Sequence, residues 1–310
     1  MRNTFFDEVY KLAKNDKDII VLMSDTGATV FEEFRRNLPD QCVNVGIAEQ
    51  NLIGIAAGLT MNGKKVYCYG IIPFVTSRCH DQIRVDLCCQ NLPVTIVGVG
   101  VGYDYSTLGP THHGIEDIAL MRVLPNMEVY CPSDNYMTKG LVRYLDKVQK
   151  GPVYVRVDRT GEPEFNLIQK DYNKGYNILH RGKEIVILAT GRMVWTALQV
   201  RDNLSNFLDV GVIDVYRLKP LNESLLSMIK APFVATLEAH SIIGGLGSSM
   251  AEMYAESHLN PHFVRLGMAD RHCRVYGDRD YLQRYFNLDV KKLTNVLLHW
   301  YQGYTQVEDY

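Results

Sequence analysis

The chain has 310 residues, 46% of them hydrophobic and 22% charged, which is typical of a folded globular protein. Its length predicts two domains. Lys and Arg number 33 against 35 Asp and Glu, and the net charge of −2 argues against a general nucleic-acid-binding surface. No apolar run approaches the roughly 20 residues that span a membrane, and the polar start lacks the pattern of a secretory signal. Seven scattered cysteines without a CxxC pair suggest reduced thiols, so we expect a cytoplasmic protein. Because of its charge and its lack of a long apolar run, we expect it to bind neither nucleic acid nor membrane.

The first half of the chain alternates amphipathic helices with short apolar strands. The helical spacing of Phe6, Val9, Tyr10 and Leu12 predicts a helix over residues 3–15. A strand with no polar alternation follows at 19–23, as expected in a parallel sheet that is buried on both faces. The same pattern predicts further strands at 65–70, 94–100 and 127–131, separated by helices at 49–61, 74–90 and 133–149.

Residues 160–182 interrupt this alternation, because they are polar and contain three glycines and a proline. We interpret residues 163–182 as a linker between a domain of residues 1–162 and a domain of residues 183–310. The second half predicts strands at 185–189, 210–215 and 233–238, and helices at 193–206, 222–229, 247–256 and 290–301. The predicted fold class is α/β, with two three-layer α/β/α domains whose sheets are mostly parallel.

Glu49 is the first candidate for chemistry. It follows a strand-like apolar run and begins a predicted helix, where the helix dipole favours a carboxylate. A simple helix-start acid therefore remains an alternative to a functional group. Small residues at Gly54, Ala57 and Gly58 share one face of this helix, which indicates close packing against another helix or another subunit.

Adjacent histidines, His112 and His113, lie in a glycine-rich loop after the strand at 94–100. Loops after parallel strands are where α/β folds bind ligands, and imidazoles there could transfer protons. Adjacent residues rarely bind one metal together, and no other ligand stands at a suitable spacing, so we predict no metal site in this chain.

Two arginines near a strand end, Arg156 and Arg159, could hold a phosphate or carboxylate through their guanidinium groups. A surface ion pair with Asp158 is the alternative. The glycine-rich stretch 244–248 matches neither a dinucleotide fingerprint nor a P-loop, so we do not assign nucleotide binding to it. Glu238, His240 and His272 lie near predicted strand ends, and we expect structural roles for them at an interface.

Taken in order along the chain, these segments resemble the C-terminal half of transketolase and of 1-deoxyxylulose-5-phosphate synthase. The resemblance covers essentially the whole chain, as a pyrimidine-binding domain followed by the transketolase C-terminal domain. It rests on Gly46–Gln50, Phe74, Gly109–His112, Leu124–Met127, Cys131–Asp134, Arg159 and Gly244–Ser248.

The resemblance implies thiamine diphosphate as cofactor. In this family the glutamate at the Glu49 position hydrogen-bonds N1′ of the aminopyrimidine, and the aromatic at the Phe74 position stacks on that ring. The resemblance also implies that His112 faces the oxygens of the substrate and that Arg159 binds substrate phosphate. The catalytic residues implied are Glu49 and His112; Asp25 and Gln82 are further candidates for cofactor binding, and His113 and Leu108 for substrate binding.

One motif of the family is absent from the chain. The G-D-G…N motif that holds the diphosphate through Mg²⁺ has no match, and the nearest string, Gly277-Asp278-Arg279, lacks the second glycine. The chain therefore resembles the C-terminal subunit of a split transketolase. This implies an N-terminal partner subunit that carries the diphosphate and Mg²⁺ site, in an α2β2 assembly with sites at subunit interfaces.

A departure from the family pattern concerns the substrate. Transketolases usually carry an acid just before the Gly-x-Thr-His stretch, but Leu108 stands there, and an apolar side chain cannot accept a hydrogen bond from a sugar hydroxyl. The leading reading is transfer of a two-carbon ketol unit from a ketose or ketose phosphate to an aldose-type acceptor. The alternatives are a 2-oxoacid dehydrogenase β subunit, a pyruvate-condensing synthase subunit and a noncatalytic scaffold subunit.

Overall fold

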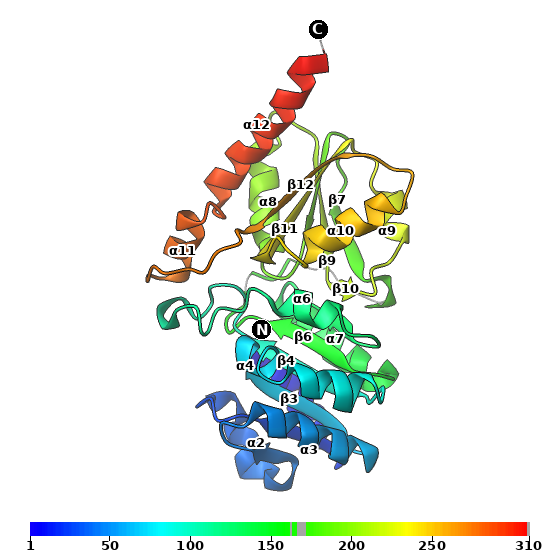
Figure 1. Ribbon diagram of the computed structural model, residues 1–310, viewed down its shortest axis with the longest axis vertical. Helices are drawn as coiled ribbons and strands as arrows, with labels where there is room; N and C mark the ends of the chain where they lie inside the picture. The colour runs from blue at the N-terminus through cyan, green and yellow to red at the C-terminus, as the bar shows by residue number, and fades with distance from the viewer. Residues whose placement is uncertain (162, 166–171, 309–310) are drawn as a thin grey trace.

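The computed structural model describes residues 1–161, 163–165 and 172–308, with side chains described to residue 304. It contains two mostly parallel β-sheets with helices on both faces, and this confirms the predicted α/β class (Figure 1). The domain boundary at 162 and residues 166–171 of the predicted linker lie outside the described residues.

The first sheet has seven strands, and the central ones are buried on both faces. In β3, Val66 and Cys68 pack on one side while Tyr67 and Tyr69 pack on the other, which explains the continuous apolar sequence. The order across the sheet is β10 (Arg217–Lys219), β5 (Glu128–Tyr130), β6 (Val153–Val157), β4 (Val94–Val99), β3 (Lys65–Ile71), β1 (Ile19–Met23) and β2 (Cys42–Asn44).

Helices cover both faces of this sheet. One face packs against α1 (Arg2–Ala13), η1 (Thr29–Phe31), α2 (Glu32–Asn37) and α7 (Asn135–Val148). The other face packs against α3 (Glu49–Met61), α6 (Asp117–Arg122) and the short helices α4 (Ile72–Val75) and η3 (Ile83–Cys88). Between these two short helices lies α5 (His80–Gln82), which has no buried residue. Two further 3₁₀ turns, η2 (Pro39–Gln41) and η4 (Ser106–Leu108), lie in the loops before β2 and after β4.

The second sheet has five strands, in the order β12 (His262–Met268), β11 (Phe233–Ser241), β8 (Ile185–Ala189), β9 (Val210–Val215) and β7 (Tyr176–His180). Figure 1 shows α8 (Met193–Leu204), α11 (Arg279–Tyr285) and α12 (Val290–Glu308) together on one side of it. The opposite face packs against α9 (Ser224–Met228) and α10 (Leu246–Ala255).

A buried arginine joins the two halves of the molecule. Nε of Arg156, in β6, donates to Oδ2 of Asp117 at 2.7 Å, and its Nη2 donates to the carbonyls of Gly114 at 2.7 Å and Ala239 at 2.8 Å. Both charged side chains are almost fully buried. Arg156 therefore belongs to the contact between the sheets, and of the two arginines near the end of β6 only Arg159 is exposed.

The glycine-rich stretch 244–248 starts helix α10. The Glu238 carboxylate accepts the backbone N–H groups of Leu246 at 2.7 Å and Gly247 at 2.8 Å. A Cβ at Gly245 would lie 1.9 Å from Oε2 of Glu238, so this position requires glycine. A carboxylate of the chain itself therefore occupies the amide groups that an external anion would need.

Two predicted elements differ from the structure, and a strand forms where none was predicted. The single helix predicted at 74–90 is wrong: Cys79 leaves helical backbone geometry, and the segment forms α4, α5 and η3 instead. β7 lies inside the segment interpreted as a linker and pairs antiparallel with β9; the 3₁₀ turn η5 (Tyr172–Lys174) precedes it. β10, which the sequence did not predict, follows β9 and pairs antiparallel with β5 of the first sheet.

Candidate active site

The predicted site residues gather at the carboxyl edge of the first sheet. Glu49 begins α3 directly after the β2 loop, Phe74 follows β3, His112 lies in the long loop after β4, and Arg159 follows β6. Because parallel strands end at the same edge, residues distant in sequence meet here, as in other α/β folds.

Glu49 is a buried carboxylate with an arginine partner. Its side chain is 3% exposed, and Oε2 accepts a hydrogen bond from Nη1 of Arg78 at 2.6 Å. The Arg78 side chain is 41% exposed, so the arginine lies between the carboxylate and solvent. Its guanidinium carbon also lies 4.3 Å from the centre of the Phe74 ring, a cation–π distance.

Aromatic contacts continue from Phe74 to Arg159. The Phe74 ring meets the His112 ring edge to face, with centroids 5.0 Å apart at 75°. His112 lies 6.0 Å from the Tyr105 ring, and the Arg159 guanidinium lies 4.8 Å over that tyrosine. An unbroken series of contacts therefore runs from Glu49 through Arg78, Phe74, His112 and Tyr105 to Arg159.

Local contacts position His112 and Arg159, the two residues of this series that are candidates for substrate binding. The Thr111 hydroxyl and Nδ1 of His112 lie 2.9 Å apart, at hydrogen-bond distance. Partial burial lowers the pKa of His112 below its ordinary value, so its ring is neutral near pH 7. Oδ2 of Asp104 accepts the backbone N–H of Arg159 at 2.7 Å, which fixes the start of the segment that carries the guanidinium.

Other predicted residues lie apart from this series. Asp25 is exposed, and Oδ1 accepts a hydrogen bond from the Asn44 amide at 3.4 Å. Gln82 is half-buried in α5. No hydrogen bond, ion pair or ring contact between described residues joins Asp25 or Gln82 to the series from Glu49 to Arg159.

His113 and Leu108 point in different directions within the same loop. His113 is buried against Tyr103, with ring centroids 5.0 Å apart, and burial lowers its pKa. Leu108 is 49% exposed at the end of η4 and leaves this position open to a bound molecule. Of the adjacent histidines, therefore, only His112 contacts Phe74.

Arg78 is the site residue that the sequence analysis missed. Its signal was a basic residue four positions after Phe74, but in the continuous helix predicted there this spacing suggests only a surface pair. The break of that helix after α4 places Arg78 over both Glu49 and Phe74. The carbonyl of Arg78 also accepts a hydrogen bond from the Gln50 side chain at 3.2 Å.

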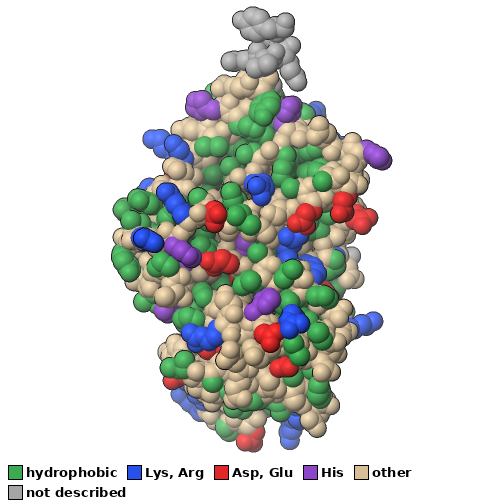
Figure 2. Space-filling model, viewed as in Figure 1, with side chains coloured by type: hydrophobic (Ala, Val, Ile, Leu, Met, Phe, Trp, Pro, Cys, Tyr) green, Lys and Arg blue, Asp and Glu red, His purple; other side chains and the backbone are tan. Residues whose placement is uncertain are grey.

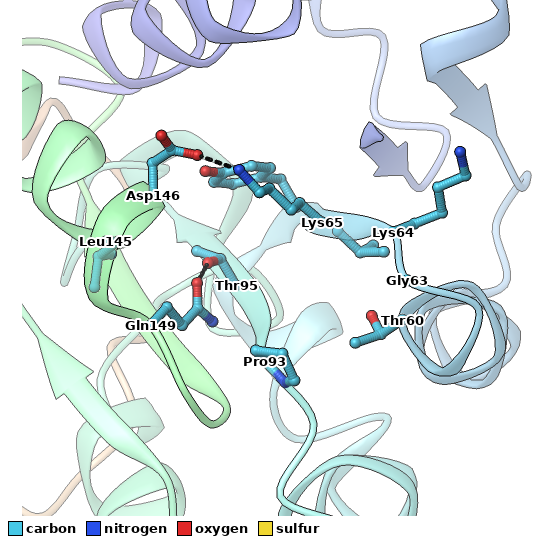
Figure 3. Close-up of a pocket in the computed structure, with 11 residues that line it drawn as sticks. Thr60, Gly63, Lys64, Lys65, Pro93, Thr95, Leu145, Asp146 and Gln149 are labelled. Atoms are coloured by element: carbon cyan, nitrogen blue, oxygen red, sulfur yellow. Dashed lines mark hydrogen bonds and ion pairs between the residues drawn. The ribbon is translucent and has the colours of Figure 1, made fainter. Parts of the chain in front are cut away.

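A separate cavity of about 260 Å³ lies at the opposite edge of the first sheet, near the amino ends of β3 and β4 (Figure 3). Figure 3 shows Lys65 directed to Asp146, and Thr95 bonded to Gln149. Lys65 also pairs with Asp16, and Lys64 with Asp18. Both lysines are therefore already neutralised by carboxylates, and we assign no ligand to this cavity.

Charged side chains of both signs are interspersed with hydrophobic ones over the face shown in Figure 2.

Within the described ranges, no cluster of three or more His, Cys, Asp or Glu residues could hold a metal ion. The carboxylate of Asp278, in the string nearest to the missing motif, accepts the backbone N–H of Tyr281 at 2.7 Å and so caps α11. The helices of the described segments are too short or too polar to cross a bilayer.

Comparisons with known proteins identify the family of both domains. Residues 1–162 match the family model for the transketolase pyrimidine-binding domain, and residues 175–293 match that for the transketolase C-terminal domain. A putative transketolase C-terminal section from Methanocaldococcus jannaschii is 35% identical, with 96% of this chain and 95% of that protein covered. One of the subunits of the apulose-4-phosphate transketolase of Actinobacillus succinogenes is 32% identical, with coverage of 96% of this chain and 97% of that protein.

A solved structure gives the same answer at the level of the fold. A split-gene transketolase, described as an inactive β4 tetramer, superimposes with a TM-score of 0.85 at 32% identity, and the match covers 97% of each chain. The agreement extends over both domains, and these three proteins are about as long as this chain. The chain therefore belongs to the transketolase family, in which it corresponds in extent to the C-terminal section.

Proposed function

We propose that this chain is one subunit of a thiamine diphosphate-dependent transketolase and transfers a two-carbon ketol unit from a ketose or ketose phosphate to an aldose-type acceptor. Family members use this cofactor. The observation that carries the proposal is the series of contacts from Glu49 to Arg159, which aligns a buried carboxylate, an aromatic ring, a neutral imidazole and an exposed guanidinium at one sheet edge.

The residues present fit an aminopyrimidine. Such a ring is planar and carries hydrogen-bonding nitrogens, so it needs a polar partner beside a flat apolar surface. The buried Glu49 carboxylate lies beside the half-buried Phe74 ring, and both contact Arg78. Gly46, before Glu49, has a φ of +78°, and a Cβ added there would meet no atom within 4 Å. Ile47 is 78% exposed, so this side is open.

Each residue then has a separate task. Glu49 holds a proton at the hydrogen bond to the pyrimidine, and Phe74 orients the ring by stacking. When bound, thiamine diphosphate would supply the nucleophilic carbon and the electron sink for cleavage of the carbon–carbon bond. His112, neutral near pH 7, can donate to or accept from a substrate oxygen, while Arg159 binds a phosphate at the far end of the substrate.

The diphosphate half of the site is proposed to lie on a second chain. This subunit would carry the G-D-G…N motif and Mg²⁺ in an α2β2 assembly. In support, the carboxylate of Asp278, in the string nearest to that motif, is engaged as the N-cap of α11. The open face of α3 near Gly54 and Gly58, where an added Cβ would meet nothing within 4 Å, gives a partner close access to the segment that holds Glu49.

Reconstitution of the chain with its partner subunit tests this proposal. We expect ketol transfer from a ketose phosphate that requires both subunits, thiamine diphosphate and Mg²⁺. Glu49→Gln should lower kcat at least about 100-fold, because a positioned acid–base group contributes about 10² to 10⁴. Turnover of pyruvate, with or without a lipoyl domain, would instead support a decarboxylating enzyme.

A matched control is Glu8→Gln. Glu8 is another buried carboxylate paired with an arginine, Arg143, but it lies in α1 away from the site. The control should retain activity if both variants fold. Equal activity of Glu49→Gln and wild type would overturn the mechanism, and absence of any turnover with the correct partner would favour a scaffold.

A further inference from the structure

Two buried carboxylates adjoin Arg159. Asp104, in the loop after β4, is 9% exposed, and Asp158, the residue before Arg159, is 1% exposed. Oδ2 of Asp104 accepts the backbone N–H of Arg159 at 2.7 Å. The Arg159 guanidinium lies 4.8 Å over the ring of Tyr105, the residue after Asp104. These two neighbouring loop residues therefore hold both the backbone and the side chain of Arg159.

Both carboxylates have charged partners in the C-terminal domain. Nη1 of Arg279, the first residue of α11, lies 3.4 Å from Oδ1 of Asp104 and 3.5 Å from Oδ1 of Asp158. Arg192, directly before α8, lies 3.8 Å from Asp158. Because a buried carboxylate is costly without a cation beside it, these arginines compensate two charges that the first domain buries next to Arg159.

Helix α11 lies against the loop after β4 at both of its ends (Figure 1). Its first residue, Arg279, pairs with Asp104. Phe286, directly after the helix, stacks on Tyr103 with ring centroids 5.1 Å apart. Between these two contacts Leu282 is fully buried in the core of the C-terminal domain. The helix is therefore anchored in one domain and contacts two adjacent loop residues of the other.

We propose that Arg279 is a positioning residue for Arg159: through Asp104 it holds the Arg159 guanidinium where the phosphate of a phosphorylated donor binds. The C-terminal domain then contributes to donor selection without touching the substrate. This inference rests on the proposed function in one respect, the binding of substrate phosphate by Arg159. The coupling of Arg279 to Arg159 does not depend on catalysis, so it is tested separately.

Amide hydrogen exchange in the full chain tests the coupling. Arg279→Gln removes the charge opposite Asp104, and we expect exchange in peptides that span residues 157–161 to accelerate about tenfold at the Arg159 N–H. Arg122→Gln is the matched control, because Arg122 also pairs across the two domains, with Glu252 of α10, and its side chain is 18% exposed against 22% for Arg279. The control should leave these peptides unchanged, and melting temperatures should show that both variants are folded.

Donor kinetics in the reconstituted enzyme distinguish positioning from a purely structural role. Arg279→Gln should raise KM for fructose 6-phosphate about three- to thirtyfold, while kcat and the KM for fructose stay unchanged. In an Arg159→Gln background the same change should add nothing, because the guanidinium that it positions is absent. Arg122→Gln should use both donors like wild type.

Asp104→Asn is the second variant if Arg279→Gln does not fold. It keeps an oxygen that can accept the Arg159 N–H but loses the ion pair with Arg279, and we expect the same changes in exchange and in KM. The inference is overturned if exchange at residues 157–161 stays at the wild-type rate, if KM rises equally for both donors, or if the effects of Arg279→Gln and Arg159→Gln add. Faster exchange without turnover of either donor would support the coupling and overturn the proposed function alone.

Discussion

Arg78 covers Glu49: one guanidinium nitrogen lies 2.6 Å from the buried carboxylate, while the guanidinium carbon lies 4.3 Å from the Phe74 ring centre. The arginine therefore satisfies a carboxylate that would otherwise be buried without a charged partner. It also holds the two residues proposed to contact the pyrimidine in a fixed relation to each other. The ion pair with Arg78 therefore compensates the charge of the buried Glu49 carboxylate before any ligand binds.

Removal of the Arg78 guanidinium should destabilise the fold. Arg78→Ala leaves the Glu49 carboxylate buried and unpaired, and we expect the free energy of unfolding to fall by about 1–3 kcal/mol. Urea denaturation measures this value. Arg84→Ala is the matched control, because Arg84 pairs with Asp81 at the same 2.6 Å but both side chains are exposed. Its cost should be below about 1 kcal/mol, and equal costs would contradict this account of Glu49.

The contact between the two sheets depends on Arg156. Arg156→Met leaves Asp117 buried without its cation and removes the hydrogen bond to the Ala239 carbonyl. We expect a loss of about 3–5 kcal/mol and two separate unfolding transitions in calorimetry. Arg201→Met, which removes an exposed pair with Asp202, should leave one transition. A single transition at wild-type stability in Arg156→Met would refute the role of this arginine.

Two buried groups in β11 should give opposite pH dependences. Burial raises the pKa of Glu238 to about 7, so the folded state keeps a proton between pH 4.5 and 7 that the unfolded state releases. Its contribution to stability therefore falls as pH rises through this window. Burial lowers the pKa of His240 to about 4, so the unfolded state binds more protons between pH 4 and 6.5, and this contribution rises with pH.

Substitutions separate these opposing slopes. Glu238→Gln leaves the His240 contribution, so the free energy of unfolding should increase from pH 5 to 6.5. His240→Asn leaves the Glu238 contribution, so it should decrease from pH 5 to 7. We expect each change to be of order 1–3 kcal/mol, with a flatter profile in wild type. Denaturation at a series of pH values measures this, and parallel profiles for the two variants would be incompatible with the assigned pKa directions.

Arg159 should discriminate donors by charge. In the reconstituted enzyme, Arg159→Gln should raise KM for a phosphorylated ketose about tenfold or more, because a charged hydrogen bond is lost. The same variant should use the corresponding unphosphorylated ketose with unchanged kcat/KM. Steady-state kinetics with the two donors provides the test. An equal loss with both donors would mean that Arg159 supports the loop rather than the phosphate.

Leu108 offers a gain-of-function test. Leu108→Asp places a carboxylate at the exposed position where transketolases usually carry an acid, and we expect kcat/KM for hydroxylated ketose donors to increase several-fold, since one hydrogen bond contributes about 1 kcal/mol. Leu108→Ala controls for the loss of the apolar side chain. Unchanged kinetics in Leu108→Asp, with a loss in Leu108→Ala, would show that the natural substrate contacts the leucine itself.

Much of the fold was predictable because buried parallel strands leave a direct signal. The runs at 19–23, 94–100 and 185–189 are continuous apolar segments, and the structure places β1, β4 and β8 there. Short edge strands such as β2 and β10 leave no such signal, because three residues are too few for a pattern. Their pairing is decided by the neighbouring strand.

The site was predictable to the extent that it follows strand ends. Glu49, Phe74, His112 and Arg159 were predicted from residue type and order along the chain, and the structure joins them in one series of contacts, while their roles stay predictions. Arg78 was not predicted, because its place depends on the break after α4. At that break, the Thr76 hydroxyl donates a hydrogen bond to the Ile72 carbonyl at 2.6 Å, and the backbone of Cys79 is not helical. The burial of His113 likewise depends on Tyr103, a contact that the sequence does not specify.

The strand β10 has a consequence for any attempt to divide this molecule. It belongs in sequence to the second half, directly after β9, yet it completes the first sheet beside β5. A fragment cut between the two halves would expose the hydrogen-bonding groups of β5 as an open edge, which favours aggregation. A soluble fragment of the first domain would thus have to carry residues 217–219 grafted beside β5. The first sheet is complete only when a strand from the second half of the chain is present.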